Sequence, residues 1–219
     1  MDTGAEVVVV GGGAAGLSLA WRLLSPPDGV PVPRVTLVEA PPGPLRPPER
    51  TWCFWEAGPG AYDSLLTASW NGLRVRGPDG SGPVRSLGGL RYKMLRSGDF
   101  ERGLRPRLSA LRRVEAVVEE VADGPDGAVV VCRTAGGTVS RLPARWVFDS
   151  RPPAVAPPAR TVLLQHFRGL FVRTGRPVFA PDAVELMDFR TPQPAHGLSF
   201  GYVLPVSPYE ALVEYTEFG

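Results

Sequence analysis

The sequence predicts an α/β fold, in which a Rossmann-like dinucleotide-binding domain precedes a mostly antiparallel-sheet domain that is truncated at its C-terminus. A β-branched run and a glycine-rich turn open the chain, and a second strand ends in an acid. Near residue 155 the pattern changes from α/β to nearly all β. We expect a first domain over residues 1–155, with a small strand-rich insertion at about 56–90. Residues 156–219 would begin an incomplete substrate-binding domain.

The N-terminal segment has the pattern of a β-α-β unit. Residues 7–10 are a continuous valine run, which is typical of a parallel strand buried on both faces. Residues 11–13 form a turn, and residues 14–24 form a helix that the following proline pair ends. Residues 34–39 are the next strand.

The rest of the chain predicts one more helix and many strands. Ser97 is a suitable N-cap for a helix over roughly 99–110, with acids in its first turn. Pro152 to Pro158 are expected to form a linker. Strands are expected at 68–87 (several short ones), 114–121, 129–133, 138–142, 146–149, 161–173, 183–189, 199–206 and 210–217.

The glycine-rich turn fits the dinucleotide fingerprint G-x-G-x-x-G, because it follows a strand, opens a helix and is followed by Glu39 at the end of the second strand. Gly11 permits the tight turn, Gly13 lets the backbone approach a pyrophosphate, and Gly16 lets helix and strand pack closely. Glu39 is suited to accept hydrogen bonds from ribose hydroxyls. The expected phosphate-binding residues are Gly11, Gly12, Gly13, Ala14, Ala15 and Gly16.

The pattern after the fingerprint favours FAD over NAD. Small residues at its end resemble FAD-dependent families, and a plain NAD dehydrogenase would continue with β-α-β-α. Arg50 is either a contact to the flavin phosphate or ring, or a loop arginine. Asp149 is either a contact to the flavin or its ribitol, or a turn residue at a strand end.

A set of motifs, in order, resembles bacterial lycopene β-cyclases, which are FAD-dependent flavoproteins. The resemblance covers essentially residues 6–218. Tyr215 stands where many relatives carry a second acid, and family members continue for a long stretch beyond the length of this chain. The matching segments are residues 50–55 (RTWCFW), 92–100, 147–151, 165–169 (QHFRG), 186–190 (LMDFR), 200–205 and 211–216 (ALVEYT).

This resemblance implies non-redox cyclisation of the ψ end groups of lycopene to β-ionone rings. It implies reduced FAD as the active cofactor, NAD(P)H as its reductant, and Glu214 as the catalytic acid. From the residues alone, Glu214 is either an outward-facing strand residue or an acid whose apolar surroundings keep it protonated. Trp52, Trp55 and Tyr92 are candidate substrate contacts, with plain core packing as the other interpretation.

Composition excludes several other classes. The 24 basic and 22 acidic side chains argue against a dedicated nucleic-acid binder. Two cysteines and two histidines exclude a structural zinc site in practice and suit a reducing cytosol. No apolar run is long enough to span a bilayer and no signal peptide is recognisable. Because lycopene and other polyene carotenoids dissolve only in membranes, a cytoplasmic enzyme would dock peripherally at the membrane surface. The oligomeric state stays open.

Two other functions remain open at this point. One is an FAD- and NAD(P)H-dependent redox enzyme, namely a monooxygenase, halogenase or prenyl reductase, which would share the fingerprint but not RTWCFW. The other is an inactive dinucleotide-binding fragment that needs a partner supplying the missing C-terminal part.

Overall fold

The computed structural model describes residues 5–46, 48–152 and 158–219. The chain forms two compact units, and each unit contains two separate stretches of sequence. Unit 1 comprises Met1–Arg50 with Arg96–Ala156, and unit 2 comprises Thr51–Leu95 with Pro157–Gly219.

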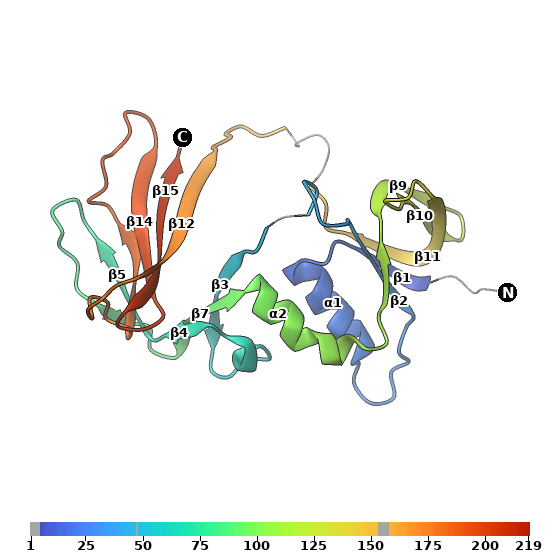
Figure 1. Cartoon of the computed structure of the whole chain (residues 1–219), viewed down its shortest axis with the longest axis horizontal. Coiled ribbons are helices and arrows are strands. Elements are labelled where there is room, and N and C mark those ends of the chain that lie inside the picture. Colours follow the sequence, from blue (N-terminus) through green and yellow to red (C-terminus); the bar gives the residue numbers. More distant parts are fainter. Residues whose placement is uncertain (1–4, 47, 153–157) are drawn as a thin grey trace. The chain divides into compact units, whose positions relative to one another are not determined.

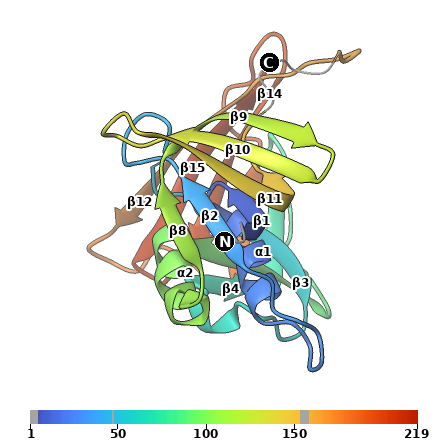
Figure 2. The ribbon, with the colours of Figure 1, turned by 90° about the vertical axis from the view of Figure 1, so that its right-hand side faces the viewer.

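Unit 1 is built on a six-stranded sheet in the order β8-β2-β1-β11-β10-β9. Strands β8, β2, β1 and β11 pair in parallel, and β10 and β9 extend the sheet as an antiparallel hairpin (Figure 2). Helices α1 and α2 pack against each other (Figure 1). The elements are β1 Ala5–Val10, α1 Ala14–Leu24, β2 Val35–Glu39, α2 Ser97–Leu104, η2 Arg105–Leu108, β8 Arg112–Glu115, β9 Val117–Gly124, β10 Gly127–Arg133 and β11 Val139–Asp149.

The predicted β-α-β unit is confirmed. The four valines at 7–10 are at most 5% exposed, because β1 lies between β2 and β11 in the sheet. Helix α1 covers the predicted residues and buries Leu17 and Ala20. A buried cluster on these strands forms part of the core of unit 1; it comprises Val8, Val10, Val38, Ala116, Val118, Val130, Cys132 and Ala144.

Two local predictions in unit 1 are wrong. Ser97 is the first residue of α2 and not its N-cap, because its hydroxyl accepts a hydrogen bond from the Arg50 backbone N–H at 2.9 Å. The strands expected at 138–142 and 146–149 are one continuous strand, β11. Its first half pairs antiparallel with β10 and its second half pairs parallel with β1, with Ala144 bonded into both ladders.

Unit 2 contains a six-stranded sheet in the order β12-β15-β14-β13-β5-β6 and a three-stranded sheet in the order β3-β7-β4. The larger sheet is antiparallel except for the β13–β5 pair, as the sequence predicts for the second domain. The elements are β3 Thr51–Ala57, η1 Asp63–Leu65, β4 Ala68–Trp70, β5 Gly72–Arg76, β6 Arg85–Ser86, β7 Leu90–Arg96, β12 Gln165–Arg173, β13 Ala183–Asp188, β14 Leu198–Pro205 and β15 Glu210–Phe218.

The strand-rich segment expected at about 56–90 is not an insertion within the first domain. It belongs to unit 2, because β5 pairs in parallel with β13 and thereby enters the large sheet. The strand character of this segment is visible in the sequence, but its partner strand β13 lies far along the chain. Arg76 and Glu185, which are in contact, are 109 residues apart. Nothing local in the sequence identifies that partner.

The only lysine of the chain, Lys93, is buried in unit 2 with 1% of its side chain exposed. Its ammonium donates to Glu56 Oε2 at 2.7 Å, to Asp63 Oδ1 at 2.6 Å and to the Gly58 carbonyl at 3.0 Å. All three donors of the group are therefore satisfied, as a buried ammonium requires. The contacts hold β3, β7 and η1 together.

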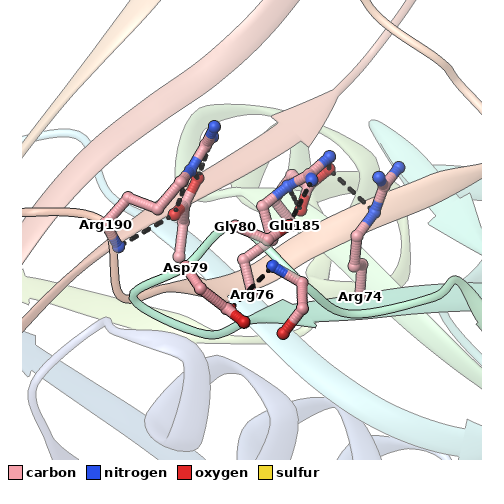
Figure 3. A network of polar contacts seen from close by, with 8 residues as sticks. Arg74, Arg76, Asp79, Gly80, Glu185 and Arg190 are labelled. Carbon is pink, nitrogen blue, oxygen red and sulfur yellow. Dashed lines mark hydrogen bonds and ion pairs between the residues drawn. The ribbon is translucent and has the colours of Figure 1, made fainter.

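A second charged cluster joins β5 to β13 through Glu185, on which Arg74 and Arg76 converge (Figure 3). The Arg74 Nε lies 3.1 Å from Glu185 Oε1, and the Arg76 guanidinium reaches both carboxylate oxygens at 3.1 and 3.2 Å. These side chains are only 19–24% exposed. One carboxylate thus keeps two closely spaced guanidiniums together on the parallel pair of the sheet.

We expect Glu185→Gln to lower the free energy of unfolding by about 1–3 kcal/mol, because it leaves two partly buried guanidiniums without their counter-charge. Urea unfolding followed by circular dichroism measures this loss. Glu119→Gln is the matched control, since Glu119 pairs with Arg133 where both side chains are 39–48% exposed, and it should leave the urea midpoint nearly unchanged. Equal midpoints for the two variants would contradict the role assigned to Glu185.

Across the described ranges, no helix has both the length and the apolar character that crossing a bilayer requires.

Candidate functional site

The glycine-rich turn between β1 and α1 has the geometry of a phosphate-binding turn. Gly11 has φ +98°, a conformation that L side chains rarely adopt, and its N–H donates to the Val38 carbonyl at 2.9 Å. Ser150, which directly follows β11, supports the turn: its N–H and hydroxyl both donate to the Val10 carbonyl, at 3.1 and 2.7 Å. A Cβ at Gly11 would lie 2.2 Å from the Ser150 hydroxyl oxygen.

Gly13 and Gly16, which follow along the motif, are glycines for different physical reasons. A Cβ at Gly16 would lie 2.0 Å from the Gly11 carbonyl oxygen, so the helix approaches the turn too closely for any side chain. A Cβ at Gly13 would meet no protein atom within 4 Å, and its φ of −76° suits any residue. Protein packing explains Gly16, whereas Gly13 leaves free space at the start of the helix.

That free space lies at the N-terminus of α1, where backbone N–H groups lack partners within the helix. Gly13 is the N-cap and offers no side-chain cap, and the first turn contains no acidic residue. Ala14 and Ala15 add only methyl groups there. The turn therefore presents donors and a partial positive charge to an anion, which fits a dinucleotide pyrophosphate.

Glu39 lies beside this turn, at the end of β2. A Cβ at Gly12 would lie 2.7 Å from its carboxylate carbon and oxygens, so the carboxylate covers Gly12. Burial raises the pKa of Glu39, and Arg46, whose Nε lies 3.5 Å from Glu39 Oε1, opposes that shift. The Glu39 side chain is 23% exposed, so it is not fully enclosed by protein.

Asp149 pairs with Val10 in the sheet register, so the end of β11 lies next to the glycine-rich turn. Its carboxylate accepts hydrogen bonds from Arg151, which lower its pKa, and Arg151 Nη1 donates to the Val118 carbonyl at 2.6 Å. Arg50 is exposed and is held by its backbone to Ser97. The structure thus brings the glycines, Glu39 and Asp149 together, whereas the backbone hydrogen bonds of Arg50 go to Ser97 and not to the turn.

In unit 2, Glu214 lies on the buried side of β15. Its neighbours Val213 and Tyr215 are 37% and 41% exposed and point to the other face, whereas Leu212 and Thr216, on the same face as Glu214, are buried. Burial raises the pKa of Glu214, and the Thr216 hydroxyl, which donates to Glu214 Oε1 at 3.1 Å, opposes this shift. Within the described ranges, no ion pair involves Glu214.

Cys53, Tyr92 and Tyr202 surround Glu214 with weakly acidic groups. Tyr202 is its register partner on β14, and Glu214 contributes to raising the pKa values of all three groups, although burial is the larger cause. The pKa of Cys53 rises to about 11. These three groups stay neutral near pH 7, so none of them supplies a positive charge that would stabilise the ionised form of the carboxyl group.

The aromatic candidates separate into two groups. The rings of Trp55 and Tyr92 have centroids 4.4 Å apart and are tilted by 35°, and the Tyr92 ring also lies 6.0 Å from that of Trp70. Strand alternation puts the Trp52 side chain on the opposite face of β3. Glu56, which accepts a hydrogen bond from Lys93, lies on that same face. The structure therefore brings Trp55 and Tyr92 into the Glu214 cluster and does not bring Trp52 there.

Sequence reasoning missed Tyr202, Gly169 and Ser150. Tyr202 and Gly169 lie directly opposite Glu214 on the two neighbouring strands. Both belong to motifs that the sequence analysis identified, so the signal was present. Strand alternation assigns them to the face of Glu214 only when the register between the strands is known.

Comparisons with known proteins agree with this fold. The sequence model of a family described as "Lycopene cyclase protein" matches residues 6–219. No curated protein sequence matches the chain. Several solved structures share the fold but little sequence.

A geranylgeranyl bacteriochlorophyll reductase-like protein from Thermoplasma acidophilum aligns with a TM-score of 0.67 and 16% identity, over 97% of this chain and 56% of that chain. A flavoprotein/dehydrogenase from Cytophaga hutchinsonii aligns with a TM-score of 0.65 and 14% identity, over 97% and 55%. The p-nitrophenol 4-monooxygenase of Pseudomonas putida gives a TM-score of 0.60 and 17% identity, over 99% and 57%. The chain thus has the fold of FAD-dependent flavoproteins and spans about half the length of these structures.

Proposed function

Because this chain belongs to the lycopene cyclase protein family, we propose that it contains the FAD-binding turn and the catalytic acid of a lycopene β-cyclase. The reaction is the cyclisation of the ψ end groups of lycopene to β-ionone rings, with no net transfer of electrons. Glu214 is the proton donor. Unit 1 binds the cofactor and unit 2 contributes the wall of the substrate site.

The observation that carries this proposal is the surroundings of Glu214. Glu214 lies on the buried face of a sheet, beside a thiol and two phenols. These surroundings favour the protonated form of its carboxyl group. A hydrocarbon substrate offers no charge to pair with a carboxylate, so only a neutral acid suits it. Redox chemistry on a polar substrate would not require this arrangement.

The steps balance with a single carboxyl group. Glu214 transfers its proton to the terminal double bond of a ψ end, which leaves a tertiary carbocation. The neighbouring double bond attacks that cation and closes a six-membered ring. The Glu214 carboxylate then removes a proton from the ring, which forms the ring double bond and restores the acid. General acid–base catalysis of this kind contributes on the order of 10² to 10⁴-fold.

The residues of unit 1 fit FAD. Gly13 and the N-terminus of α1 would hold the pyrophosphate, and Glu39 would accept hydrogen bonds from the ribose. Asp149, fixed by Arg151, would orient the ribitol, and Arg50 would contact the flavin. Bound in its reduced form, flavin supplies negative charge that stabilises a cationic hydrocarbon, and NAD(P)H serves only as its reductant.

The substrate class extends to other acyclic polyene carotenoids. Such substrates reside in the bilayer, so the enzyme acts at the cytoplasmic surface of the membrane as a peripheral protein. Exposed apolar side chains just before β12, namely Val162, Leu163 and Leu164, support contact with an apolar phase.

The direct test supplies the flavin-loaded protein with lycopene in vesicles under anaerobic conditions. We expect cyclised carotenoid to accumulate in large excess over the reductant consumed. Consumption of reductant or oxygen in an amount equal to the product formed would instead indicate the redox chemistry of a reductase or monooxygenase. A product without a closed ring would indicate the same.

The raised pKa of Glu214 also predicts a pH dependence of stability. The folded protein binds the proton of Glu214 more tightly than the unfolded chain does, so this contribution is complete below the unfolded pKa of about 4.3. It is lost as pH rises through the folded pKa. We therefore expect the melting temperature of the parent, relative to Glu214→Gln, to fall as pH rises from 4 to 8 in thermal denaturation scans. A constant difference across that range would contradict the assigned burial.

A further inference from the structure

Thr216 is fully buried on β15, and its hydroxyl has a single hydrogen-bond partner among the described residues. Its side chain lies on the face of Glu214, two residues along the strand, and the hydroxyl donates to Glu214 Oε1 at 3.1 Å. The register partners of Thr216 are Phe167 on β12 and Phe200 on β14, and neither of these side chains has an oxygen or nitrogen that could accept. The carboxyl group is therefore the polar partner of this hydroxyl.

The fold alone does not require a hydroxyl at residue 216. Valine has the same branched shape, suits a strand equally well and would place a methyl group against the neighbouring phenylalanines. A buried hydroxyl instead loses its hydration and gains one hydrogen bond in return, so it adds little to stability. What threonine provides here and valine would not is the hydrogen bond to the acid.

The two oxygens of the Glu214 carboxyl group have different surroundings. Oε1 accepts from Thr216, whereas Oε2 lies toward Gly169 on β12, where a Cβ would be 3.1 Å from it. Within the described part of the chain, Oε2 has no hydrogen-bond partner. A protonated carboxyl group carries its hydrogen on one oxygen and accepts through the other. Because Thr216 donates to Oε1, the acidic hydrogen belongs on Oε2.

The hydrogen bond from Thr216 becomes stronger when the carboxyl group loses its proton. Hydrogen bonds to a carboxylate are roughly twice as strong as those between neutral groups. Burial raises the pKa of Glu214, and Thr216 is the group that opposes this rise. Burial thus keeps the acid protonated before the reaction, while the hydroxyl stabilises the negative charge that develops during proton transfer.

We propose that Thr216 is a positioning residue for the acid: its hydroxyl fixes Oε1 as the accepting oxygen, leaves the transferable proton on Oε2, and stabilises the carboxylate once that proton has left. The hydroxyl keeps its own hydrogen throughout, so no proton passes through Thr216. This inference rests on the proposed function and adds to it a residue that orients the acid without contacting the substrate.

The ionisation of Glu214 can be measured separately from that of its neighbours. Three weakly acidic groups on β3, β7 and β14 have raised pKa values, so they stay neutral between about pH 5 and 9. They belong to Cys53, Tyr92 and Tyr202. The residues that β12 places on this face do not ionise; they are Phe167, Gly169 and Phe171. A change in pH profile that depends on Thr216 therefore reports on Glu214.

The experiment compares two substitutions at residue 216 in the flavin-loaded protein. Thr216→Val removes the hydroxyl and keeps the shape, and Thr216→Ser keeps the hydroxyl and removes the methyl group. Thr67→Val is the matched control, because the Thr67 hydroxyl is also buried in unit 2 but has no hydrogen-bond partner in the described part of the chain.

Two measurements are made over the same pH range. Turnover is measured with lycopene in vesicles. Infrared difference spectroscopy follows the C=O stretching band of the protonated Glu214 carboxyl group, which is assigned by its loss in Glu214→Gln. Because the band requires no substrate, it tests the hydrogen bond independently of turnover.

Thr216→Val should lower the maximal kcat by roughly tenfold and move the alkaline limb of the pH profile to higher pH, because the carboxylate loses a hydrogen bond. Its carboxyl band should shift to higher wavenumber and persist to higher pH, while the melting temperature and flavin content stay close to those of the parent. Thr216→Ser should restore the pH profile and bring kcat to within about threefold of the parent. Thr67→Val should match the parent.

Three results would overturn the inference. A carboxyl band and pH profile that are unchanged in Thr216→Val, while Glu214→Gln is inactive, would remove Thr216 from this role and leave the proposed function standing. A loss of turnover in Thr216→Ser equal to that in Thr216→Val would mean that the methyl group, and hence packing, is what matters at this residue. Parent-like turnover by Glu214→Gln would instead reject the proposed function itself, and the inference with it.

Discussion

Replacing Glu214 with glutamine should reduce cyclisation on the order of 10² to 10⁴-fold while leaving the fold and the flavin content intact. Glutamine preserves the size of the side chain and can still accept from the Thr216 hydroxyl, but it has no acidic proton to give. The measurement is β-carotene production by lycopene-accumulating cells that express each variant, supported by turnover of the purified protein.

Glu217→Gln is the matched control for this experiment. It makes the same chemical change on the same strand, but alternation along β15 puts Glu217 on the opposite face, where it accepts a hydrogen bond from the Tyr215 hydroxyl. The same alternation separates Tyr215 from Glu214, so an acid at position 215 would not share the site. Unchanged output from Glu214→Gln, or an equal loss from Glu217→Gln, would reject Glu214 as the proton donor.

Gly13→Ala should abolish flavin binding, or weaken it by at least roughly tenfold, without lowering the stability of the flavin-free protein. The new methyl group meets no protein atom within 4 Å, so its effect falls on the ligand alone. A methyl group in the space of the pyrophosphate would block the backbone N–H groups at the helix terminus. Flavin absorbance per protein and the melting temperature of the flavin-free form provide the two readouts.

Two further glycines give this prediction its contrast. Gly16→Ala should lose both flavin and stability, because its Cβ would lie 2.0 Å from the Gly11 carbonyl oxygen. Gly89→Ala, where a Cβ also meets nothing within 4 Å, should change neither. Retention of flavin by Gly13→Ala would show that the pyrophosphate does not bind at this turn.

Local patterns were sufficient for the first part of the fold. The valine run, the glycine-rich turn and the proline pair predicted β1 and the whole of α1, because each signal acts within a few residues. The hydroxyl of Ser97 was misassigned because it binds Arg50, which lies 47 residues away in sequence. The same limit applies to β5, whose partner strand belongs to a distant stretch of the chain.

The candidate site was also predictable only where the signal lies within a short stretch of sequence. Glu214 and the fingerprint residues were found because short motifs contain them. The face that Glu214 occupies, the close approach of its carboxyl group to Gly169 and the neighbouring Tyr202 depend on the register of three strands. The sequence alone left the orientation of Glu214 open between solvent and core, and the pairing of β15 with β14 and β12 resolves it.

The double hydrogen bond between Arg50 and Ser97, at 2.8 and 2.9 Å, has a consequence for how such proteins diversify. The chain leaves unit 1 after Arg50 and returns to it at Arg96, so the two ends of the segment over residues 51–95 lie next to each other. Changes in the loops between its strands leave both ends, Arg50 and Ser97, where they are, while β5 keeps its pairing with β13. The connections of unit 1 therefore do not depend on the length of this segment of unit 2.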